Sequence, residues 1–505
     1  MKYLFVHANS SQVVYQDLAK SDSAIETPIW AALLENSLST HGVGCDLLDC
    51  EVLGLTWQES AQRIADSGCE IAVFCVYGQQ PSASTQNMTG CVGTAELLKQ
   101  ISPEITIAFV GAHVSALPSQ TLDAHDCIDI VFTNEGVLAL HDIAKIHNLS
   151  NKLQNVQGIA YRDSQGEIHI NPASNTVSQK QLDNLLPGIN WNKVNPVVGY
   201  RTSGWHSWLN NSEKTPFASI YTSLGCPYRC SFCMINIINR THNDQINAAD
   251  MNGFRYWDPE TTIDQIQQLA DLGVKNIKFA DELFVLNPNH FLKICQLIID
   301  RGITDLNIWA YARVDTCKPE YLDILRQAGV KSLALGIENP DPDQRKLIHK
   351  QGFNNVNIGD LVRLIQSHDI AVAGNYIFGL HGDTQETMQR TLDFAKQNLT
   401  DMANFYCAMA YPGSPLYTQA IKENIKLPES YSGYSQHSYD CQPLPTQNLS
   451  ASEILKFRDH AWNEYHGLPE YEKLLNNKYG PHAVDQLIQT RSKVLMRKLL
   501  EENNV

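Results

Sequence analysis

Short apolar runs alternate with amphipathic stretches over the first 145 residues. A helix is predicted between the first two runs, behind Pro28, by four apolar residues at helical spacing: Trp30, Leu33, Leu34 and Leu38. Alternating strands and helices predict a parallel, doubly wound sheet, which binds ligands in the loops at the carboxyl ends of its strands. The predicted strands are 3–6, 45–48, 71–76, 105–110 and 128–132.

The loops that follow these strands carry small and polar residues. Ordinary turn chemistry explains any one of them, but four such loops at one edge of a sheet favour a ligand crevice. The four loops are 7–10, 77–82, 111–113 and 134–136.

Residues 146–215 differ in character, with polar linkers, a hairpin-like pair of runs around Gly166 and a break at Pro187-Gly188. We interpret them as a bridge between domains. A second alternation of strands and helices follows, and its six repeats fall short of the eight that close a full barrel, so an open, partial (β/α)6 barrel is predicted. Its predicted strands are 217–221, 276–279, 307–309, 332–335, 374–378 and 404–408.

After about residue 425 the chain is rich in Tyr and Ser and then helical, with Ser450 and Glu453 at capping-box spacing. The sequence therefore predicts an α/β protein with a Rossmann-like first domain, a partial barrel and a mostly helical C-terminal domain. The predicted limits are 1–145 for the first domain, 146–215 for the bridge, 216–425 for the barrel and 426–505 for the C-terminal domain.

Composition narrows the possible partners. The 505 residues are 43% hydrophobic and 18% charged, enough for a large core, and 38 basic against 54 acidic residues give a net charge of −16. That balance opposes nucleic acids and anionic membranes as partners. The first residues do not resemble a signal peptide, and no apolar run approaches the roughly 18–20 residues of a membrane helix, so a cytoplasmic location is expected. Thirteen scattered cysteines indicate free thiols in a reducing compartment.

The strongest local signal is the segment Gly225-Cys-Pro-Tyr-Arg-Cys-Ser-Phe-Cys233, directly after the first barrel strand. Three thiolates in one loop can converge on an iron–sulfur cluster, and three ligands leave one iron of a four-iron cluster open to another molecule. The alternatives are three unrelated buried cysteines or a structural zinc site. A zinc site needs four ligands, and no second pair of Cys or His follows at a suitable distance.

This cysteine loop resembles that of the radical S-adenosylmethionine superfamily, with Phe232 at its aromatic position. The N-terminal half is similar to the cobalamin-binding domain that precedes the radical domain in the cobalamin-dependent class. Residues 110–118 and 129–136 stand where that class has glycine-rich loops, although Asn134 and Val137 depart from its commoner Gly-Glu-Gly-Glu pattern.

The resemblance continues through the barrel. Five segments resemble the successive strand motifs of the class, and His381 stands where the family usually has proline or a small residue. The segments are 279–282, 312–315, 336–339, 378–384 and 411–417. An ordered series of this kind is more specific than the cysteine loop alone.

The resemblance implies that Cys226, Cys230 and Cys233 hold a 4Fe–4S cluster whose free iron binds S-adenosylmethionine, which an electron then cleaves to methionine and a 5′-deoxyadenosyl radical. Glu282 and Arg313 would engage the methionine amino and carboxylate groups. The other predicted residues are Glu338 at the amino group or ribose, and Gly379 and Tyr411 beside the adenine. The alternatives are salt bridges at the barrel rim for the charged residues and plain turns for the last two.

Cobalamin binding is likewise implied for the N-terminal loops. An Asp-x-His-x-x-Gly motif is missing from the sequence, so we expect cobalamin without a histidine ligand and without its nucleotide base coordinated, although His7 and His113 are candidates by position. The predicted cobalamin-binding residues are Tyr77, Gln80, Ser82, Gly111, His113, Ser115, Glu135 and Gly136.

Such cofactors suit methylation of an unactivated carbon in a small molecule. One S-adenosylmethionine would methylate cob(I)alamin, and a second would generate the radical that removes hydrogen from the substrate, which then takes the methyl group from methylcobalamin. A flavodoxin or ferredoxin is the expected reductant. Two aromatic groups could cap the pocket and select the substrate, or simply pack between domains: Trp205, His206 and Trp208, and Tyr431, Tyr434, His437 and Tyr439.

Three other functions compete with this prediction. A radical oxidase, cyclase or ring-contracting enzyme would use the same cofactors without methyl transfer. Methylthiolation of tRNA is opposed by the acidic balance of the chain. A non-catalytic cofactor carrier would not need the series of barrel motifs.

Overall fold

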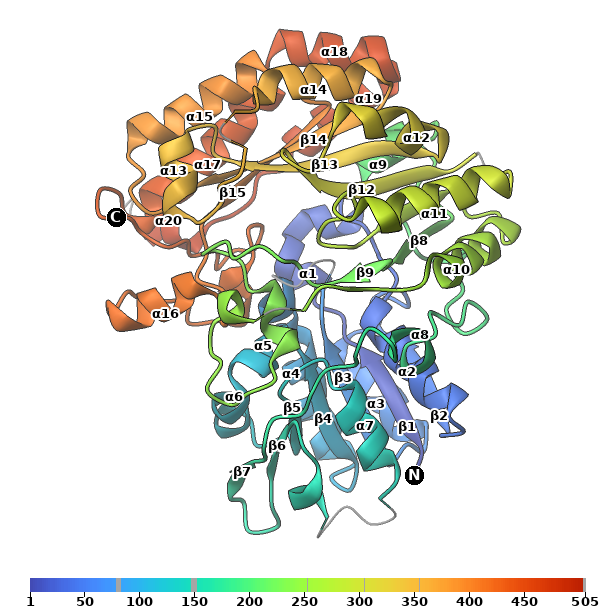
Figure 1. The fold of residues 1–505 in the computed structure, drawn as a ribbon. Helices are drawn as coiled ribbons and strands as arrows, with labels where there is room; N and C mark the ends of the chain where they lie inside the picture. The colour runs from blue at the N-terminus through green and yellow to red at the C-terminus, as the bar shows by residue number, and fades with distance from the viewer. Residues whose placement is uncertain (79–82, 147–151, 252, 304, 354, 503–505) are drawn as a thin grey trace.

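Two mostly parallel sheets, each flanked by helices, form the two halves of the molecule (Figure 1). The structure is a computed structural model and describes residues 1–78, 83–146, 152–251, 253–303, 305–353 and 355–502. Among these residues no helix is long and apolar enough to cross a membrane.

The first sheet has seven strands in the order β2-β1-β3-β4-β5-β6-β7. Its first five strands are parallel, which confirms the predicted doubly wound sheet. They are β1 (Tyr3–His7), β2 (Cys45–Asp49), β3 (Ile71–Val76), β4 (Thr106–Gly111) and β5 (Ile130–Phe132).

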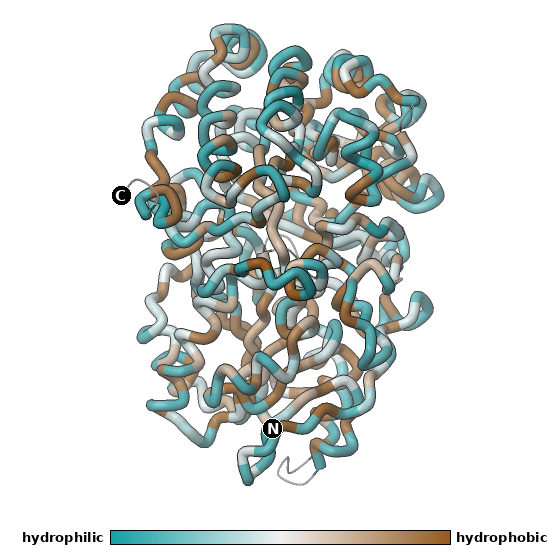
Figure 2. Tube along the Cα trace, turned by 90° about the vertical axis from the view of Figure 1, so that its left-hand side faces the viewer, coloured by the Kyte–Doolittle hydropathy of each residue, from teal (hydrophilic) through white to brown (hydrophobic). Residues whose placement is uncertain are grey.

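Side chains of these strands alternate between two faces, as the period of a strand requires. Tyr3 and Phe5 pack with helices α2 (Ile29–Thr40) and α7 (Val137–Ala144), whereas Leu4 and Val6 pack with α3 (Trp57–Asp66) and α4 (Ser84–Ile101). Because both faces are covered, the strands are almost continuously apolar. In Figure 2 the hydrophobic segments gather inside this half, and the outer helices alternate between hydrophilic and hydrophobic.

The hairpin expected around Gly166 forms, as β6 (Ile159–Arg162) and β7 (Ile168–Ile170). It does not stand apart between the halves, because β6 pairs antiparallel with β5 and extends the first sheet. An otherwise unpaired edge of β5 gains hydrogen-bond partners in this way. The limits of the first domain and of the bridge therefore stay predictions.

The second sheet has six parallel strands in the order β15-β14-β13-β12-β11-β8, curled and open. This confirms the predicted partial barrel. Helices α10 (Pro259–Asp271), α11 (Pro288–Asp300), α12 (Leu322–Gln327), α14 (Ile358–Ser367) and α15 (Gln385–Gln397) lie between consecutive strands in the chain. The strands are β8 (Phe217–Ile220), β11 (Asn276–Phe279), β12 (Asn307–Arg313), β13 (Val330–Glu338), β14 (Ala371–Phe378) and β15 (Met402–Cys407).

The C-terminal residues are helical, as predicted. Helix α17 (Ala451–His466) begins with the expected capping box of Ser450 and Glu453 and packs on β15, where Tyr465 meets the ring of Phe405. Helices α18 (Pro469–Tyr479), α19 (Pro481–Arg491) and α20 (Lys498–Glu502) follow. The segment after α19 returns to the N-terminal residues, and Lys493 forms an ion pair with Asp22.

Candidate active site between the two sheets

A cavity of about 750 Å³ opens between the two halves. Inward residues of the second sheet, the cysteine loop and the segment 15–26 line it, together with the start of α4. A much smaller cavity, of about 40 Å³, lies beside the carboxyl ends of β1 and β3 and shares Tyr15, Glu26, Ala83 and Gln86 with the larger one. The first sheet and the half-barrel therefore border adjoining spaces.

All three cysteines of the loop line the large cavity. The loop begins at Gly225, whose φ of 82° is left-handed and where a Cβ would lie 1.7 Å from the carbonyl oxygen of Gly253, so only glycine fits. Asn236 holds the loop at both sides of Cys226: its Oδ1 accepts from the backbone N–H (3.1 Å), and its Nδ2 donates to the carbonyl oxygen (2.7 Å).

Burial raises the pKa of the Cys226 thiol to about 12, and it also raises the pKa values of Cys230 and Cys233. Lys350 and Arg313 oppose the rise at Cys230. Among the described residues, no three His, Cys, Asp or Glu side chains are close enough to hold a single metal ion. A four-iron cluster separates its thiolates more widely than one ion does, and its iron supplies the positive charge that buried thiolates need.

Glu282 follows β11 and lines the cavity beside the cysteine loop. Its Oε2 accepts from the backbone N–H of Gly225 (3.1 Å), and burial raises its pKa to about 8. The preceding Asp281 has a different role, because its carboxylate accepts 2.6 Å hydrogen bonds from Thr222 and Ser223. Asp281 thus anchors the chain that leads into the cysteine loop and places Glu282 at the cavity.

Arg313 ends β12 and also lines the cavity. Its Nε and Nη2 donate hydrogen bonds to the Asp315 carboxylate (2.8 and 3.2 Å), and Nη2 also donates to the carbonyl oxygen of Gln351 (2.7 Å). The guanidinium carbon lies 3.7 Å from the ring centroid of Tyr228. Asp315 and Tyr228 fix the plane of the guanidinium next to the cysteine loop.

Glu338 ends β13 with a φ of 58°, a left-handed conformation that is uncommon outside glycine. Its carboxylate forms a buried ion pair with Lys350, which lines the same cavity. A Cβ at Gly336 would lie 2.5 Å from the Lys350 Nζ, so glycine leaves room for this pair. Left-handed residues with a polar function cluster at active sites.

The two residues expected beside the adenine differ in their placement. Tyr411 is half-buried and lines the large cavity. Gly379 does not line it. Its φ is 74°, and a Cβ would lie 2.8 Å from the Ile454 side chain of α17, so the glycine permits close packing of that helix. A position of Gly379 beside adenine stays a prediction.

Among the residues expected to bind cobalamin, Tyr77 lines the smaller cavity. Its ring stacks on Trp30 at 4.8 Å between centroids, and its buried hydroxyl has no partner among the described residues. Gln80 and Ser82 lie outside the described residues.

Gly111 ends β4, and the His113 that follows is buried. The His113 Nδ1 lies 3.1 Å from the Thr85 hydroxyl, and burial lowers the pKa of the imidazole to about 3. His7 instead contacts Glu51 at 3.2 Å. Burial lowers the pKa of His7, but the hydrogen bond to Glu51 and the negative charges of Asp49 and Glu51 outweigh burial and raise this pKa overall. Both histidines therefore already have side-chain partners.

Ser115 and Glu135 lie where the first half contacts the second, and Gly136 follows them in the chain. Glu135 forms a buried ion pair with Arg255 (2.7 Å), and its carboxylate accepts from the Val177 N–H (2.6 Å). Ser115 offers its carbonyl oxygen to a second arginine of the other half, and Gly136 precedes α7. The first two residues thus connect the halves, and their contact with cobalamin stays a prediction.

Several residues of the site had not been singled out from the sequence. Lys350 pairs with Glu338, 12 positions away, and Tyr228 contacts Arg313, 85 positions away. Neither separation is one at which a periodic pattern predicts contact. Arg255 pairs with Glu135 across 120 positions. Tyr228 alone had a local signal, since it lies inside the cysteine loop.

The residues present fit the implied cofactors. Three half-buried thiols line a cavity that the carboxylates of Glu282 and Glu338 also line. This cavity adjoins a second one, where the Tyr77 hydroxyl has no partner among the described residues. The donor set suits an iron–sulfur cluster with one open iron, and the carboxyl edge of the first sheet suits a bound cofactor.

Comparison with known proteins assigns both halves. The family model described as "Radical SAM superfamily" matches residues 220–395, and the model described as "B12 binding domain" matches residues 17–144. An uncharacterized methyltransferase of Pyrococcus horikoshii is 25% identical over 359 residues, which cover 70% of this chain and 71% of that protein. The anaerobic magnesium-protoporphyrin IX monomethyl ester cyclase of Cereibacter sphaeroides is 23% identical over 473 residues, 92% of this chain and 70% of that protein.

Among solved structures, the radical S-adenosylmethionine methyltransferase TsrM from Kitasatospora setae, with cobalamin and a 4Fe–4S cluster bound, has a TM-score of 0.66 at 15% identity. The match covers 91% of this chain and 90% of TsrM, and it extends the likeness of fold over both halves. The chain thus carries a radical S-adenosylmethionine domain and a B12-binding domain, the two domains of cobalamin-dependent radical S-adenosylmethionine enzymes.

Proposed function

We propose that this enzyme methylates an unactivated carbon of a small molecule. One observation carries the proposal: the cavity of the cysteine loop and the cavity at the carboxyl ends of β1 and β3 adjoin through four shared residues. A substrate in the larger cavity would therefore lie near the sites of both cofactors. Similarity to proteins named as methyltransferases supports methyl transfer as the reaction.

When bound, the cluster supplies the electron that cleaves S-adenosylmethionine, and cobalamin carries the methyl group. The chain itself binds and orients. Glu282 and Arg313, fixed by Asp281, Asp315 and Tyr228, would hold the methionine end of S-adenosylmethionine beside the open iron. Lys350, through its ion pair, would hold the Glu338 carboxylate in place at the next strand end.

The reaction balances with two electrons from an external reductant, for which a flavodoxin or ferredoxin is suitable. The substrate and two molecules of S-adenosylmethionine give methylated product, S-adenosylhomocysteine, methionine and 5′-deoxyadenosine. The acidic balance of the chain favours a small molecule over a nucleic acid as substrate, and we propose a cytoplasmic location.

The test is anaerobic reconstitution with iron, sulfide and hydroxocobalamin, followed by reduction with S-adenosylmethionine and mass analysis of the nucleosides. Methylation predicts that 5′-deoxyadenosine and S-adenosylhomocysteine both accumulate. Cys230→Ala abolishes the former, whereas the matched control Cys295→Ala, buried in α11, retains both products.

A radical cyclase or oxidase is the second candidate, because similarity to the magnesium-protoporphyrin cyclase extends over 92% of the chain. It predicts 5′-deoxyadenosine without S-adenosylhomocysteine while cobalamin stays bound. That outcome would replace the methyltransferase proposal, and absence of both nucleosides would contradict a radical reaction altogether.

A further inference from the structure

The large cavity continues into the half-barrel beyond the cofactor residues. Trp309 and Tyr311 alternate with Arg313 along β12 and line the same cavity, as residues two apart on a strand face the same side. Tyr311 is two positions before Arg313, or about 7 Å along the strand. We call the inner part of the cavity, lined by Trp205, Trp309, Tyr311, Asn375, Asn404 and Tyr406, the ring chamber. It is adjacent to the predicted position of S-adenosylmethionine.

Small residues in the central strands create the space of the ring chamber. Tyr311 is in register with Ala334 on β13, and Ala334 with Ala373 on β14. Two residues further along these strands, Gly336 is in register with Asn375. Larger side chains in this middle row would fill the half-barrel, so the sequence keeps it open between aromatic neighbours.

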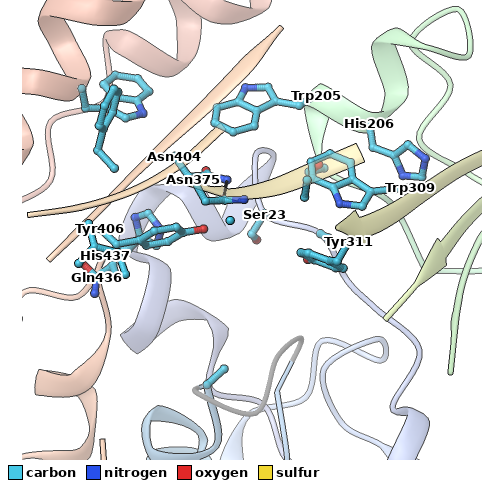
Figure 3. A pocket seen from close by; sticks show the side chains of 18 of the residues that line it. Ser23, Trp205, His206, Trp309, Tyr311, Asn375, Asn404, Tyr406, Gln436 and His437 are labelled. Atoms are coloured by element: carbon cyan, nitrogen blue, oxygen red, sulfur yellow. Dashed lines mark hydrogen bonds between the residues drawn. The ribbon is translucent and has the colours of Figure 1, made fainter. Parts of the chain in front are cut away.

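Aromatic rings border this space (Figure 3). Trp205, Trp309 and Tyr311 form one apolar group with Ala334, and Tyr406 of β15 lies on the other side. The Trp309 ring is held by His206, which packs edge-on at 5.6 Å and is itself fixed by the carbonyl oxygen of Asn307 (2.9 Å). Rigid ring faces of this kind favour flat conjugated ligands.

An amide pair supplies the polar part of the chamber. Asn404 Nδ2 donates to Asn375 Oδ1 (2.9 Å), and Asn375 Nδ2 donates to the carbonyl oxygen of Leu335 (3.2 Å). These bonds fix the orientation of both amides. The Asn404 Oδ1 accepts no hydrogen bond from the described residues, so it can accept one from a ligand.

Ionised side chains on the cavity wall near the chamber are already paired. Lys278 contacts both carboxylate oxygens of Glu26 (2.8 and 3.0 Å), and Arg458 pairs with Asp459 (2.7 Å). A charged ligand group would have to compete with these pairs, whereas an uncharged ring system would not.

We propose that the ring chamber binds the substrate and that this substrate carries a flat, uncharged conjugated ring system with a hydrogen-bond donor at its edge, accepted by Asn404. The inference rests on the proposed function, since it takes the occupant to be the molecule that is methylated. It narrows the substrate class from small molecules in general to aromatic ones.

Binding of three probes to the reconstituted protein tests the ring chamber by calorimetry, with S-adenosylmethionine and hydroxocobalamin present. We expect 2-naphthol to bind about tenfold more tightly than decahydro-2-naphthol, which has the same hydroxyl group on puckered rings. It should also bind about threefold to tenfold more tightly than naphthalene, which lacks the donor. Equal affinities for the flat and puckered alcohols, or no binding of any probe, would overturn the proposal.

Substitutions locate the binding. Trp309→Leu should lower the affinity for 2-naphthol about tenfold, and Asn404→Leu should reduce it to that for naphthalene. Trp191→Leu is the matched control, because Trp191 is also buried but does not line the cavity. An equal loss in the control would refute the assignment, and Tyr311→Leu replaces Trp309→Leu if that variant does not fold.

Nucleoside analysis of the same samples without probe separates the two proposals. Selective probe binding without cleavage of S-adenosylmethionine would refute the methyltransferase and leave a ring-binding site. Formation of both nucleosides without selective binding would refute the aromatic substrate class and leave the methyltransferase.

Discussion

Gly379 provides a sharp test of the packing between the half-barrel and the C-terminal helices. Its φ is 74°, in the left-handed region, where an alanine would lower the free energy of unfolding by about 1–2 kcal/mol because of its Cβ. The new Cβ would lie 2.8 Å from Cγ2 and 2.9 Å from Cδ1 of Ile454, which is fully buried and cannot move aside freely. Overpacking of this kind costs about 1–3 kcal/mol more.

Gly273→Ala is the matched control, because Gly273 has a φ of 79° and nothing within 4 Å of its Cβ position. Urea unfolding followed by tryptophan fluorescence measures both variants. With an m-value of about 3 kcal/mol/M, we expect the midpoint of Gly379→Ala to fall about 0.3–1 M below that of Gly273→Ala. Adding Ile454→Ala should bring the cost of Gly379→Ala down to the control level.

Two results would refute this reasoning. Equal midpoints for the two alanine variants would mean that the contact with Ile454 carries no cost. An unchanged midpoint with a tenfold loss of affinity for S-adenosylmethionine would instead place Gly379 beside the cofactor, as the sequence resemblance implied.

Three further predictions follow from the site and its surroundings. Serine in place of any one cysteine of the loop should abolish the iron content of about four per chain after reconstitution, whereas Cys295→Ser should retain it. Arg255→Met leaves the buried Glu135 carboxylate without its cation and should destabilise the interface by about 3–5 kcal/mol, measured as faster limited proteolysis between the halves. The control is Arg326→Met, which removes a half-exposed ion pair and should cost less than about 1 kcal/mol. Equal rates of proteolysis for the two variants would contradict the prediction. Burial raises the pKa of Asp383 to about 6, so the folded state binds more protons than the unfolded state between about pH 4 and 6. The free energy of unfolding should therefore fall as the pH rises over that range. A pH profile of stability identical to that of Asp383→Asn would exclude this contribution.

Local patterns predicted most of the secondary structure. The five parallel strands of the first sheet and the six of the second were readable because buried parallel strands are short, continuous apolar runs between helical patterns. The three cysteines were readable for a similar reason, since one loop carries all of them and its spacing expresses their chemistry.

Contacts between distant segments could not be read in this way. The sequence indicated neither that β6 would pair with β5 nor that residues 15–26 would line a cavity of the second sheet. Nor did it indicate that Glu135, a predicted cofactor residue, would form an ion pair with Arg255 of the other half. Contact between Gly379, a predicted adenine neighbour, and a helix about 75 positions later had no signal in the sequence either.

By itself, the sequence determined the elements, their order, the cysteine loop and the cofactors that the loop and barrel motifs imply. The tertiary structure alone decided which side chains share a cavity, such as Lys350 with Glu338 and Trp309 with Asn404. The physical reason is that strand and helix periods are set by neighbouring residues. Cavities and buried ion pairs depend instead on how separate segments pack, and one-dimensional spacing carries no record of that packing.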